Sequence, residues 1–253
     1  MEARILAAGL GTRLRPLTND RSKAMVEIGG MSLFHITQSR LANAGISHCV
    51  VNIHHFAKEF RTYIQNSEAS QVCRLSISDE SGLLLDTGGA IKHAAKHFSL
   101  KEPVVIHNVD ILSDIDFHAL EQHHLASGNL ITLCTSRRHS NRMLLFDQTG
   151  NLAGIYGRDD APGLTPLPFS GISIVSPQLF DLMPPDDKPY PVFRAYLELA
   201  KSHRIGYFMH NGDNWFDVGT LDDLERARRL FTPDALQHYI TKGVFPEKKN
   251  SLQ

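Results

Sequence analysis

The segment LAAGLGTRLRPLTNDRSKAM, residues 6–25, combines two glycines with four cationic side chains directly after a short apolar run. Gly9 and Gly11 lack the Cβ atoms that would keep an anion away from the backbone. Backbone N–H groups of a loop that follows a strand can therefore face a phosphate. Arg13 would add a planar fork of donors and Lys23 a mobile ammonium group. These residue types and their spacing favour a phosphate-binding site over an ordinary surface turn.

Two common phosphate-binding motifs do not account for this segment. Leu14 stands where the dinucleotide fingerprint G-x-G-x-x-G requires its third glycine, and no Gly-Lys-Ser/Thr follows as in a P-loop. A dinucleotide-binding oxidoreductase would also carry an acidic residue after its second strand, where VVNIHHF instead ends in polar and aromatic residues. The sequence therefore disfavours an oxidoreductase. Bound NAD in the purified protein would be evidence for that class.

Two aspartates follow predicted strands later in the chain. VVIHNVDIL is an apolar strand that ends in Asn108 and Asp110, and NWFDVGTLDDLERA places Asp217 just before a helix. The carboxyl ends of parallel strands open into one crevice, so Asp110 is expected beside the glycine-rich loop. An aspartate after a strand is more often a turn former or a helix cap than a functional residue. Without further evidence, Asp217 would be interpreted as a solvated loop residue.

A pair of glycines marks another place for close approach. LLLDTGGAIKHA puts Gly88 and Gly89 at a predicted turn that opens a helix. A flat backbone there would admit a base or a ribose. The alternative is a helix N-terminus with two flexible glycines.

The elements that must position these groups alternate between strand and helix in the first half. The hydrophobic periodicity predicts strands over Arg4–Ala8, His48–Ile53, Arg74–Ser78, Pro103–Ile106 and Asn129–Cys134, and helices over Leu33–Ala44, Phe56–Ile64, Ala90–Phe98 and Ile115–Ala126. Ser113 and Asp116 resemble a capping box at the start of the last helix. Repeated βα units of this kind predict an α/β fold, with a mostly parallel sheet covered by helices.

The second half is less regular. Met143–Phe146 and Leu152–Tyr156 flank the turn DQTGN and predict a hairpin. Strands are expected over Ile172–Val175 and Arg204–Met209, and helices over Phe193–Ser202 and Leu221–Phe231. No linker separates two domains, so we expect one domain over residues 1–232 and a partly frayed C-terminal extension over 233–253.

The bulk composition limits the class of partner. The 253 residues are 42% hydrophobic and 21% charged, which is typical of a globular protein rather than a disordered chain. The formal net charge of −1 offers no basic field for nucleic acid or an anionic membrane. Three scattered cysteines, and no signal-peptide or transmembrane pattern, predict a cytoplasmic protein with reduced thiols.

The glycine-rich segment closely resembles the signature of the sugar-1-phosphate nucleotidyltransferases, GxGTRLxPLT followed by a Pro-Lys pair. The resemblance extends from Arg4 to about Leu230, through Asp110, through WFDVGT and through PFSGISIVSPQLFDLM. It implies a Rossmann-like three-layer α/β/α fold with a mostly parallel mixed sheet, of the nucleotide-diphospho-sugar transferase type.

The resemblance also implies roles for individual residues. Arg13, Lys23 and Asp110 would be catalytic, with Arg13 facing the departing pyrophosphate and Lys23 the phosphates. Asp110 and Asp217 would hold Mg²⁺, whose preference for oxygen ligands suits two carboxylates and substrate phosphates. The nucleotide would contact the loop and the glycine pair, through Ala8, Gly9, Gly11, Thr12, Gly88 and Gly89. Ser170 and Gly171 could face the sugar.

Three departures from the family pattern stand out. Ser22 replaces the proline before Lys23, and Val109 replaces the glycine before Asp110. The Glu-Lys-Pro motif, whose lysine holds the sugar phosphate in long members of the superfamily, is missing. Arg142 and Arg158 are candidate substitutes for that lysine.

The implied reaction is NTP + sugar 1-phosphate → NDP-sugar + pyrophosphate. The short chain and its motif pattern are most similar to the members that use UTP and N-acetylmuramate 1-phosphate in cell-wall recycling. Mannose-1-phosphate guanylyltransferase-like activity is the alternative, and a phosphocholine-type cytidylyltransferase stays open. A third possibility is a regulatory subunit that binds nucleotide but has lost catalytic activity. Ser22 and Val109, which depart from the family pattern, are the residues that suggest it. The expected assembly is a monomer or homodimer, with no nucleic acid or membrane partner.

Overall fold

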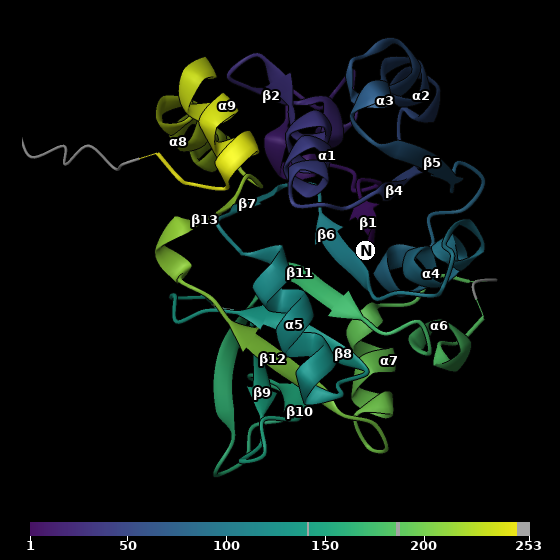
Figure 1. Ribbon diagram of the computed structural model, residues 1–253, viewed down its shortest axis with the longest axis vertical. Helices are drawn as coiled ribbons and strands as arrows, with labels where there is room; N and C mark the ends of the chain where they lie inside the picture. Colours follow the sequence, from purple (N-terminus) through teal and green to yellow (C-terminus); the bar gives the residue numbers. More distant parts are fainter. Residues whose placement is uncertain (141, 186–187, 247–253) are drawn as a thin grey trace, which may run out of the picture.

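A nine-stranded mixed sheet runs through the molecule and forms the framework around which the candidate residues are placed (Figure 1). The computed structural model describes residues 1–140, 142–185 and 188–246. The main path of the sheet has the order β10-β9-β11-β6-β1-β4-β5, and β8 joins it by pairing with β11 and β12. These strands are β1 (Glu2–Leu6), β4 (His48–Ile53), β5 (Arg74–Asp79), β6 (Val104–Asn108), β8 (Ile131–Thr135), β9 (Met143–Phe146), β10 (Leu152–Ile155), β11 (Thr165–Val175) and β12 (Ile205–Met209).

The direction of the strands divides the sheet into two parts. β5, β4, β1 and β6 are parallel to one another, as the βα repeats of the first half predict. β11 instead runs antiparallel to β6, β8 and β9. Two further ribbons lie outside the sheet, formed by β2 (Glu27–Ile28) with β3 (Met31–Ser32), and by β7 (Ile111–Ser113) with β13 (Trp215–Asp217).

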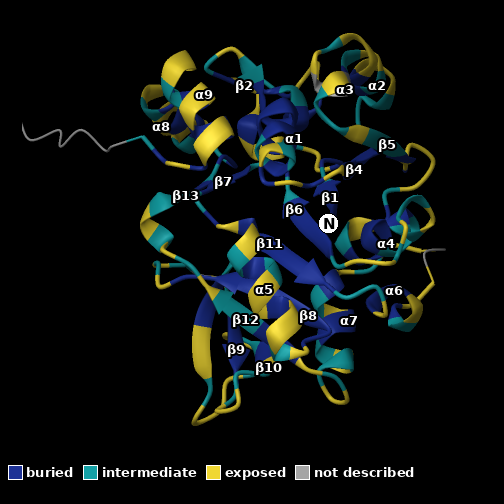
Figure 2. Ribbon diagram, viewed as in Figure 1, coloured by how far each residue is buried: buried dark blue, intermediate teal, exposed yellow. Residues whose placement is uncertain are grey.

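Helices flank the sheet, and the alternation of side chains along the strands shows why. On β6, Val105 packs into one hydrophobic cluster, whereas Val104 and Ile106 pack into a second one. Successive side chains of a strand point to opposite faces, so both faces of β6 are buried (Figure 2). The helices are α1 (Leu33–Asn43), α2 (Ala57–Asn66), α3 (Ala69–Val72), α4 (Asp86–His93), α5 (Phe117–Ser127), α6 (Leu179–Leu182), α7 (Val192–Leu199), α8 (Leu221–Leu230) and α9 (Pro233–Lys242), with 3-10 turns η1 (Thr12–Leu14), η2 (Lys23–Met25), η3 (Ala94–His97) and η4 (Gly212–Asn214).

The predicted α/β class with a mixed central sheet and flanking helices is confirmed. The predicted strand His48–Ile53 and the hairpin of β9 and β10 are both present. In the described part of the chain, no helix has the length and apolar character needed to cross a bilayer.

Two local predictions need correction. The helix expected over Ala90–Phe98 begins earlier, at Asp86, and continues as η3. The N-cap of α5 is Asp116, whose carboxylate accepts hydrogen bonds from the backbone N–H groups of His118 and Ala119. Ser113 is therefore not the cap. Ser113 belongs to β7 because its backbone pairs with Trp215 and with a tyrosine of α9.

Residues 233–242 form a helix that the sequence analysis did not predict. α9 begins at the capping hydroxyl of Thr232, and its buried side chains Leu236, Tyr239 and Ile240 pack in the core beside α1. The hydroxyl of Tyr239 accepts from Ser113 N at 3.0 Å and donates to Ser113 O at 3.1 Å. Residues 247–253, where fraying is expected, lie outside the described residues.

Candidate active site

The loop after β1 is shaped by hydrogen bonds to its backbone. Ala7 N donates to Asn52 Oδ1 at 2.6 Å, which ties the start of the loop to the end of β4. Gly11 has φ 65°, a conformation that favours glycine, and its carbonyl accepts from Leu14 N at 2.9 Å and from Thr18 Oγ1 at 2.8 Å. The loop is therefore a fixed turn that leads into η1 rather than a free strand connection.

Ser22 explains how the chain tolerates the loss of the proline at this position. Its φ of −62° is one that proline would also adopt, and its hydroxyl accepts from Ala24 N at 3.3 Å as the cap of η2. The serine therefore fixes the start of η2 in another way. Lys23 follows immediately, and its ammonium group forms an ion pair with the carboxylate of Asp110.

Asp110 and Asp217 are held next to each other by the ribbon of β7 and β13. Asp110 directly precedes β7, and Asp217, the last residue of β13, lies opposite Ile111 in the ribbon. Val218 N donates to the carbonyl of Asp110 at 2.8 Å and extends the pairing by one bond. Backbone hydrogen bonds, rather than side-chain contacts alone, thus set the spacing of the two carboxylates.

Val109 keeps the backbone before Asp110 in an ordinary conformation. It is not among the residues with positive φ, so this position does not require glycine. Its side chain is buried in the core, and its carbonyl accepts from Thr37 Oγ1 at 3.2 Å. The strand end is packed and hydrogen-bonded despite the departure from the family pattern.

The carboxyl of Asp217 is electrostatically strained in this arrangement. Burial is the main cause that raises its pKa, and the negative charge of Asp110 raises it further. The nearby charges of Lys23 and Arg13 act in the opposite direction. Asp217 Oδ1 is buried and has no hydrogen-bond partner among the described residues. A cation at this oxygen would relieve both the missing contact and the repulsion.

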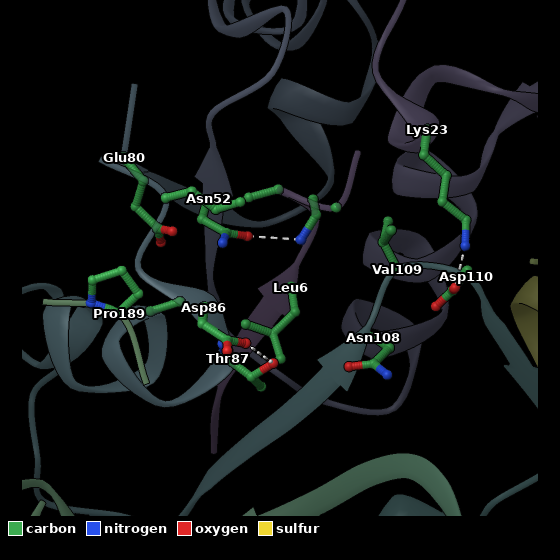
Figure 3. A pocket seen from close by; sticks show the side chains of 15 residues that line it. Leu6, Lys23, Asn52, Glu80, Asp86, Thr87, Asn108, Val109, Asp110 and Pro189 are labelled. Carbon is green, nitrogen blue, oxygen red and sulfur yellow. Dashed lines mark hydrogen bonds and ion pairs between the residues drawn. The ribbon is translucent and has the colours of Figure 1, made fainter. Parts of the chain in front are cut away.

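Two adjoining cavities are lined by these groups. The first has a volume of about 450 Å³ and the second about 710 Å³, and Thr87 and Asn108 line both. Asp110 lines the first and Asp217 the second. In the first cavity, Lys23 and Asp110 lie on one side, and Asn52 and Glu80 lie across from them (Figure 3). Both volumes are in the range of sites for small molecules.

The predicted loop residues have different places around the first cavity. Ala8, Gly9, Lys23 and Asp110 line it, whereas Gly11, Thr12 and Arg13 line neither cavity. A Cβ atom added to Gly219 would lie 2.6 Å from Arg13 Nη2 and 2.7 Å from Asp217 Oδ1. Arg13 thus lies beside Asp217, in space that Gly219 leaves free.

Gly88 and Gly89 lie inside α4 and do not line the cavities. A Cβ on Gly88 would be 2.3 Å from the ring of Tyr190, and Gly88 N donates to the carbonyl of Tyr190 at 3.0 Å. The missing side chains make room for the segment before α7. The cavity wall is formed instead by Asp86, Thr87 and Ala90 of the same helix.

Sequence reasoning missed several polar groups that line the cavities, among them Asn52, Glu80 and Arg138. Asn52 and Glu80 line the first, and Arg138 lines the second. Glu80 forms an ion pair with Arg4 at 2.8 Å, and both side chains are 0% exposed. Their positions in the sequence could have indicated two of them. Asn52 and Glu80 come at or just after the ends of parallel strands, as Asp110 does.

The donor set fits Mg²⁺. Asp110 and Asp217 offer carboxylate oxygens, and Mg²⁺ commonly takes one or two carboxylates with substrate phosphates and water. No group of three or more His, Cys, Asp or Glu side chains is gathered for a metal anywhere in the described residues.

Comparison with known proteins identifies the chain's relatives. The family model of nucleotidyl transferases matches residues 2–143. N-acetylmuramate alpha-1-phosphate uridylyltransferase of Caulobacter vibrioides is 34% identical over 83% of this chain and 91% of its own length. The enzyme of the same name from Neisseria meningitidis serogroup B is 30% identical over 91% of this chain and 98% of its own.

A solved structure shows the same fold. HddC from Yersinia pseudotuberculosis superposes with a TM-score of 0.73 at 21% identity, over 90% of this chain and 98% of that one. The glycine-rich loop and the strand that ends at Asp110 both lie within the residues that the family model matches. The chain is a nucleotidyltransferase and belongs to the nucleotidyl transferase family.

Proposed function

We propose that this chain is a Mg²⁺-dependent enzyme that transfers the uridylyl group of UTP to N-acetylmuramate 1-phosphate. The observation that carries the proposal is that two cavities share the lining residues Thr87 and Asn108, with Lys23 and Asp110 lining the first cavity and Asp217 the second. A transfer between two substrates needs both of them bound with their phosphates at one point. One cation and two carboxylates stand at that point.

The first cavity suits the nucleotide. Ala8 and Gly9 present the backbone of the loop to it, and Lys23 adds a positive charge near one end. Asn52 and Glu80 supply polar groups across the cavity from Lys23 (Figure 3). The triphosphate would therefore lie at the Lys23 end, with the base toward Asn52 and Glu80.

The reaction needs no nucleophilic side chain. A phosphate oxygen of the sugar 1-phosphate attacks the α-phosphorus, the bond from that phosphorus to the bridging oxygen breaks, and pyrophosphate carries the electron pair away. The attacking phosphate is already ionised, so no strong base is required. Catalysis then consists of positioning and neutralisation of charge.

The chain's own residues have distinct parts in this scheme. Lys23 stabilises charge on the α-phosphate, and Arg13 neutralises the departing pyrophosphate. Asp110 and Asp217 would hold Mg²⁺, which supplies charge neutralisation between the two substrates. The buried, unpartnered Oδ1 of Asp217 supports this assignment.

The choice of UTP and N-acetylmuramate 1-phosphate rests on relatives. The two uridylyltransferases at 34% and 30% identity are matched over most of their length as well as most of this chain. The second cavity is the larger of the two, which suits a bulky substituted sugar.

The test is pyrophosphate release with Mg²⁺ across several NTPs and a panel of sugar 1-phosphates. The panel includes N-acetylmuramate, N-acetylglucosamine, glucose and mannose 1-phosphates. Highest kcat/KM for UTP with N-acetylmuramate 1-phosphate supports the proposal, and preference for another pair overturns the substrate assignment. If no pair of substrates releases pyrophosphate although the protein binds NTP, the result would favour a regulatory subunit.

A further inference from the structure

Arg138 is the most tightly held cation of the second cavity. It follows β8, and its Nη1 donates to Ser136 Oγ at 2.7 Å and to Ser170 Oγ at 3.0 Å. Its Nη2 donates to the carbonyl of Phe169 at 2.6 Å. The guanidinium also stacks on Trp215, with Cζ 3.8 Å from the ring centroid. Such contacts fix a long side chain that would otherwise keep its rotamer freedom.

A second layer of hydrogen bonds fixes the groups that hold Arg138. His210 Nδ1 contacts the carbonyl of Asn211 at 2.9 Å, an acceptor only, so the proton is on Nδ1. His210 Nε2 then accepts from the hydroxyl of Ser170 at 2.7 Å, which leaves the Ser170 oxygen to accept from Arg138. The indole N–H of Trp215 donates to the carbonyl of Ser170 at 2.9 Å.

The charge of Arg138 lacks a close acidic partner. All its hydrogen-bond acceptors are neutral hydroxyl or carbonyl oxygens, and no ion pair joins it to a carboxylate of the described residues. Burial lowers the pKa of Arg138 to about 10, against the attraction of Asp217. A partly buried cation without a counterion is costly unless a ligand supplies the negative charge.

The position of Arg138 indicates which ligand that is. Arg138 and Asp217 line the same cavity, and Asp217 lies next to Asp110, which lines the other cavity. Gly171, with φ 75°, brings the backbone of β11 against Ile111 and Asn108. The wall of the second cavity that contains Gly171 therefore lies directly beside the end of β6, which leads to Asp110. An anion at Arg138 would therefore lie within reach of the reacting centre.

We propose that Arg138 binds the phosphate of the sugar 1-phosphate and presents it to the α-phosphate of the nucleotide. This inference rests on the proposed function and assigns the anchor of its second substrate. A rigid planar guanidinium suits two phosphate oxygens at once. Ser170 and Trp215 are positioning residues, because they act through Arg138.

The two arginines suggested by the sequence are less well placed. Arg158 is exposed, lines neither cavity and forms an ion pair with Asp159 at 2.9 Å. Arg142 lines the second cavity but is exposed. Neither has a stack or a set of acceptors like that of Arg138.

The test compares Arg138→Gln with Arg137→Gln, which removes the same charge from the adjacent, exposed position that lines neither cavity. Binding of N-acetylmuramate 1-phosphate and of UTP is measured by calorimetry, and KM for each by pyrophosphate release. Arg138→Gln should weaken sugar-phosphate binding and raise its KM by at least ~10-fold, the scale of a charged hydrogen bond, with UTP affinity unchanged. Arg137→Gln should match the wild type.

Further variants separate a binding role from a structural one. Arg138→Lys keeps the charge without the fork, so its KM should fall between those of the wild type and Arg138→Gln. Unchanged UTP binding shows that Arg138→Gln is folded. An Arg138→Gln enzyme with wild-type KM and affinity for the sugar phosphate overturns the inference alone. A wild-type protein that neither binds nor uses any sugar 1-phosphate of the panel overturns the proposed function and this inference with it.

Discussion

Lys23 and Asp110 form an ion pair that joins η2 to the end of β6, with side chains only 10% and 18% exposed. The pair brings together two residues that lie far apart in the chain, and Asp217 stands beside it on β13. Because the pair is shielded from water, its charges act more strongly on bound phosphates than surface charges would.

Asp110→Asn should lower kcat at least ~10²-fold, the scale of one electrostatic contact in an active site. The amide has no charge to pair with Lys23 or to hold Mg²⁺. The measurement is pyrophosphate release at saturating substrates and Mg²⁺. Asp222→Asn, on the exposed start of α8, is the matched control and should keep the wild-type rate.

Lys23→Ala should also lower kcat at least ~10²-fold, because the proposed mechanism assigns Lys23 to stabilise charge on the α-phosphate. The loss should persist when UTP is saturating, which separates it from weaker binding. Circular dichroism checks that the variant is folded. A folded Lys23→Ala protein that works at the wild-type rate would remove Lys23 from the mechanism.

Gly219→Ala should disturb Arg13 and Asp217 with little effect on stability. The new methyl group would lie 2.6 Å from Arg13 Nη2, the end of a flexible side chain that can move away. Misplacement by about 1 Å near the chemistry can cost up to ~10²-fold, so kcat/KM for UTP should fall at least ~10-fold. In an Arg13→Ala background the same change should cost much less. Equal losses in both backgrounds would argue against this link.

Gly88→Ala should destabilise the fold. Alanine in an open helix gains up to about 1 kcal/mol over glycine. Here its Cβ would be 2.3 Å from the Tyr190 ring and 2.8 Å from the Tyr190 carbonyl, so we expect a net loss of about 1–3 kcal/mol. Urea unfolding measures it. Gly82→Ala, where a Cβ meets nothing within 4 Å, is the control. A stabilised Gly88→Ala protein would contradict the packing.

Stability should fall as the pH drops from about 6.5 toward 4, in part because of His124. Its ring lies between Thr132 Oγ1 at 2.9 Å and Ser176 Oγ at 3.0 Å, and burial lowers its pKa to about 4. The unfolded chain takes up the proton near pH 6.5 and the folded chain only near 4. The native state therefore loses up to about 3 kcal/mol across this window and nothing above it.

Urea unfolding of wild type and His124→Gln at several pH values isolates this contribution. The variant should be less stable at pH 7 but should show a shallower loss between pH 6.5 and 4. Parallel curves for the two proteins would show that His124 does not cause the slope.

The sequence predicts the strands and helices well where the pattern is local. His48–Ile53 has the same bounds in the structure because its apolar residues, Cys49–Val51 and Ile53, lie close together between polar segments. β11 is longer than the predicted strand Ile172–Val175. Pro166 and Pro168 are typical of a loop and hide the first half of the strand from the sequence pattern, yet both residues pair with β9. α9 had readable signals, Thr232 before Pro233 and Gly243 after Lys242, that mark a helix start and stop.

The candidate site is less predictable because it depends on register and on distant packing. The sequence indicates Asp110 and Asp217 one by one, but only the ribbon of β7 and β13 shows that they are neighbours. Gly88 is a second example: the space left by its missing side chain is filled by Tyr190, from a loop a hundred residues later, which the local sequence does not indicate. Arg138 has no local motif, and its importance comes from Trp215 and Ser170, which other strands supply.

The ribbon that carries the two aspartates also has a consequence for how the protein is made. During synthesis, the ribosome releases the glycine-rich loop, Lys23 and Asp110 long before Trp215–Asp217, so a half-made chain holds one carboxylate without its neighbour. Tyr239, which clamps Ser113 at the other end of β7, emerges later still. The pair of carboxylates is thus completed only when almost the whole described chain has been translated, and we expect an unfinished product to be inactive.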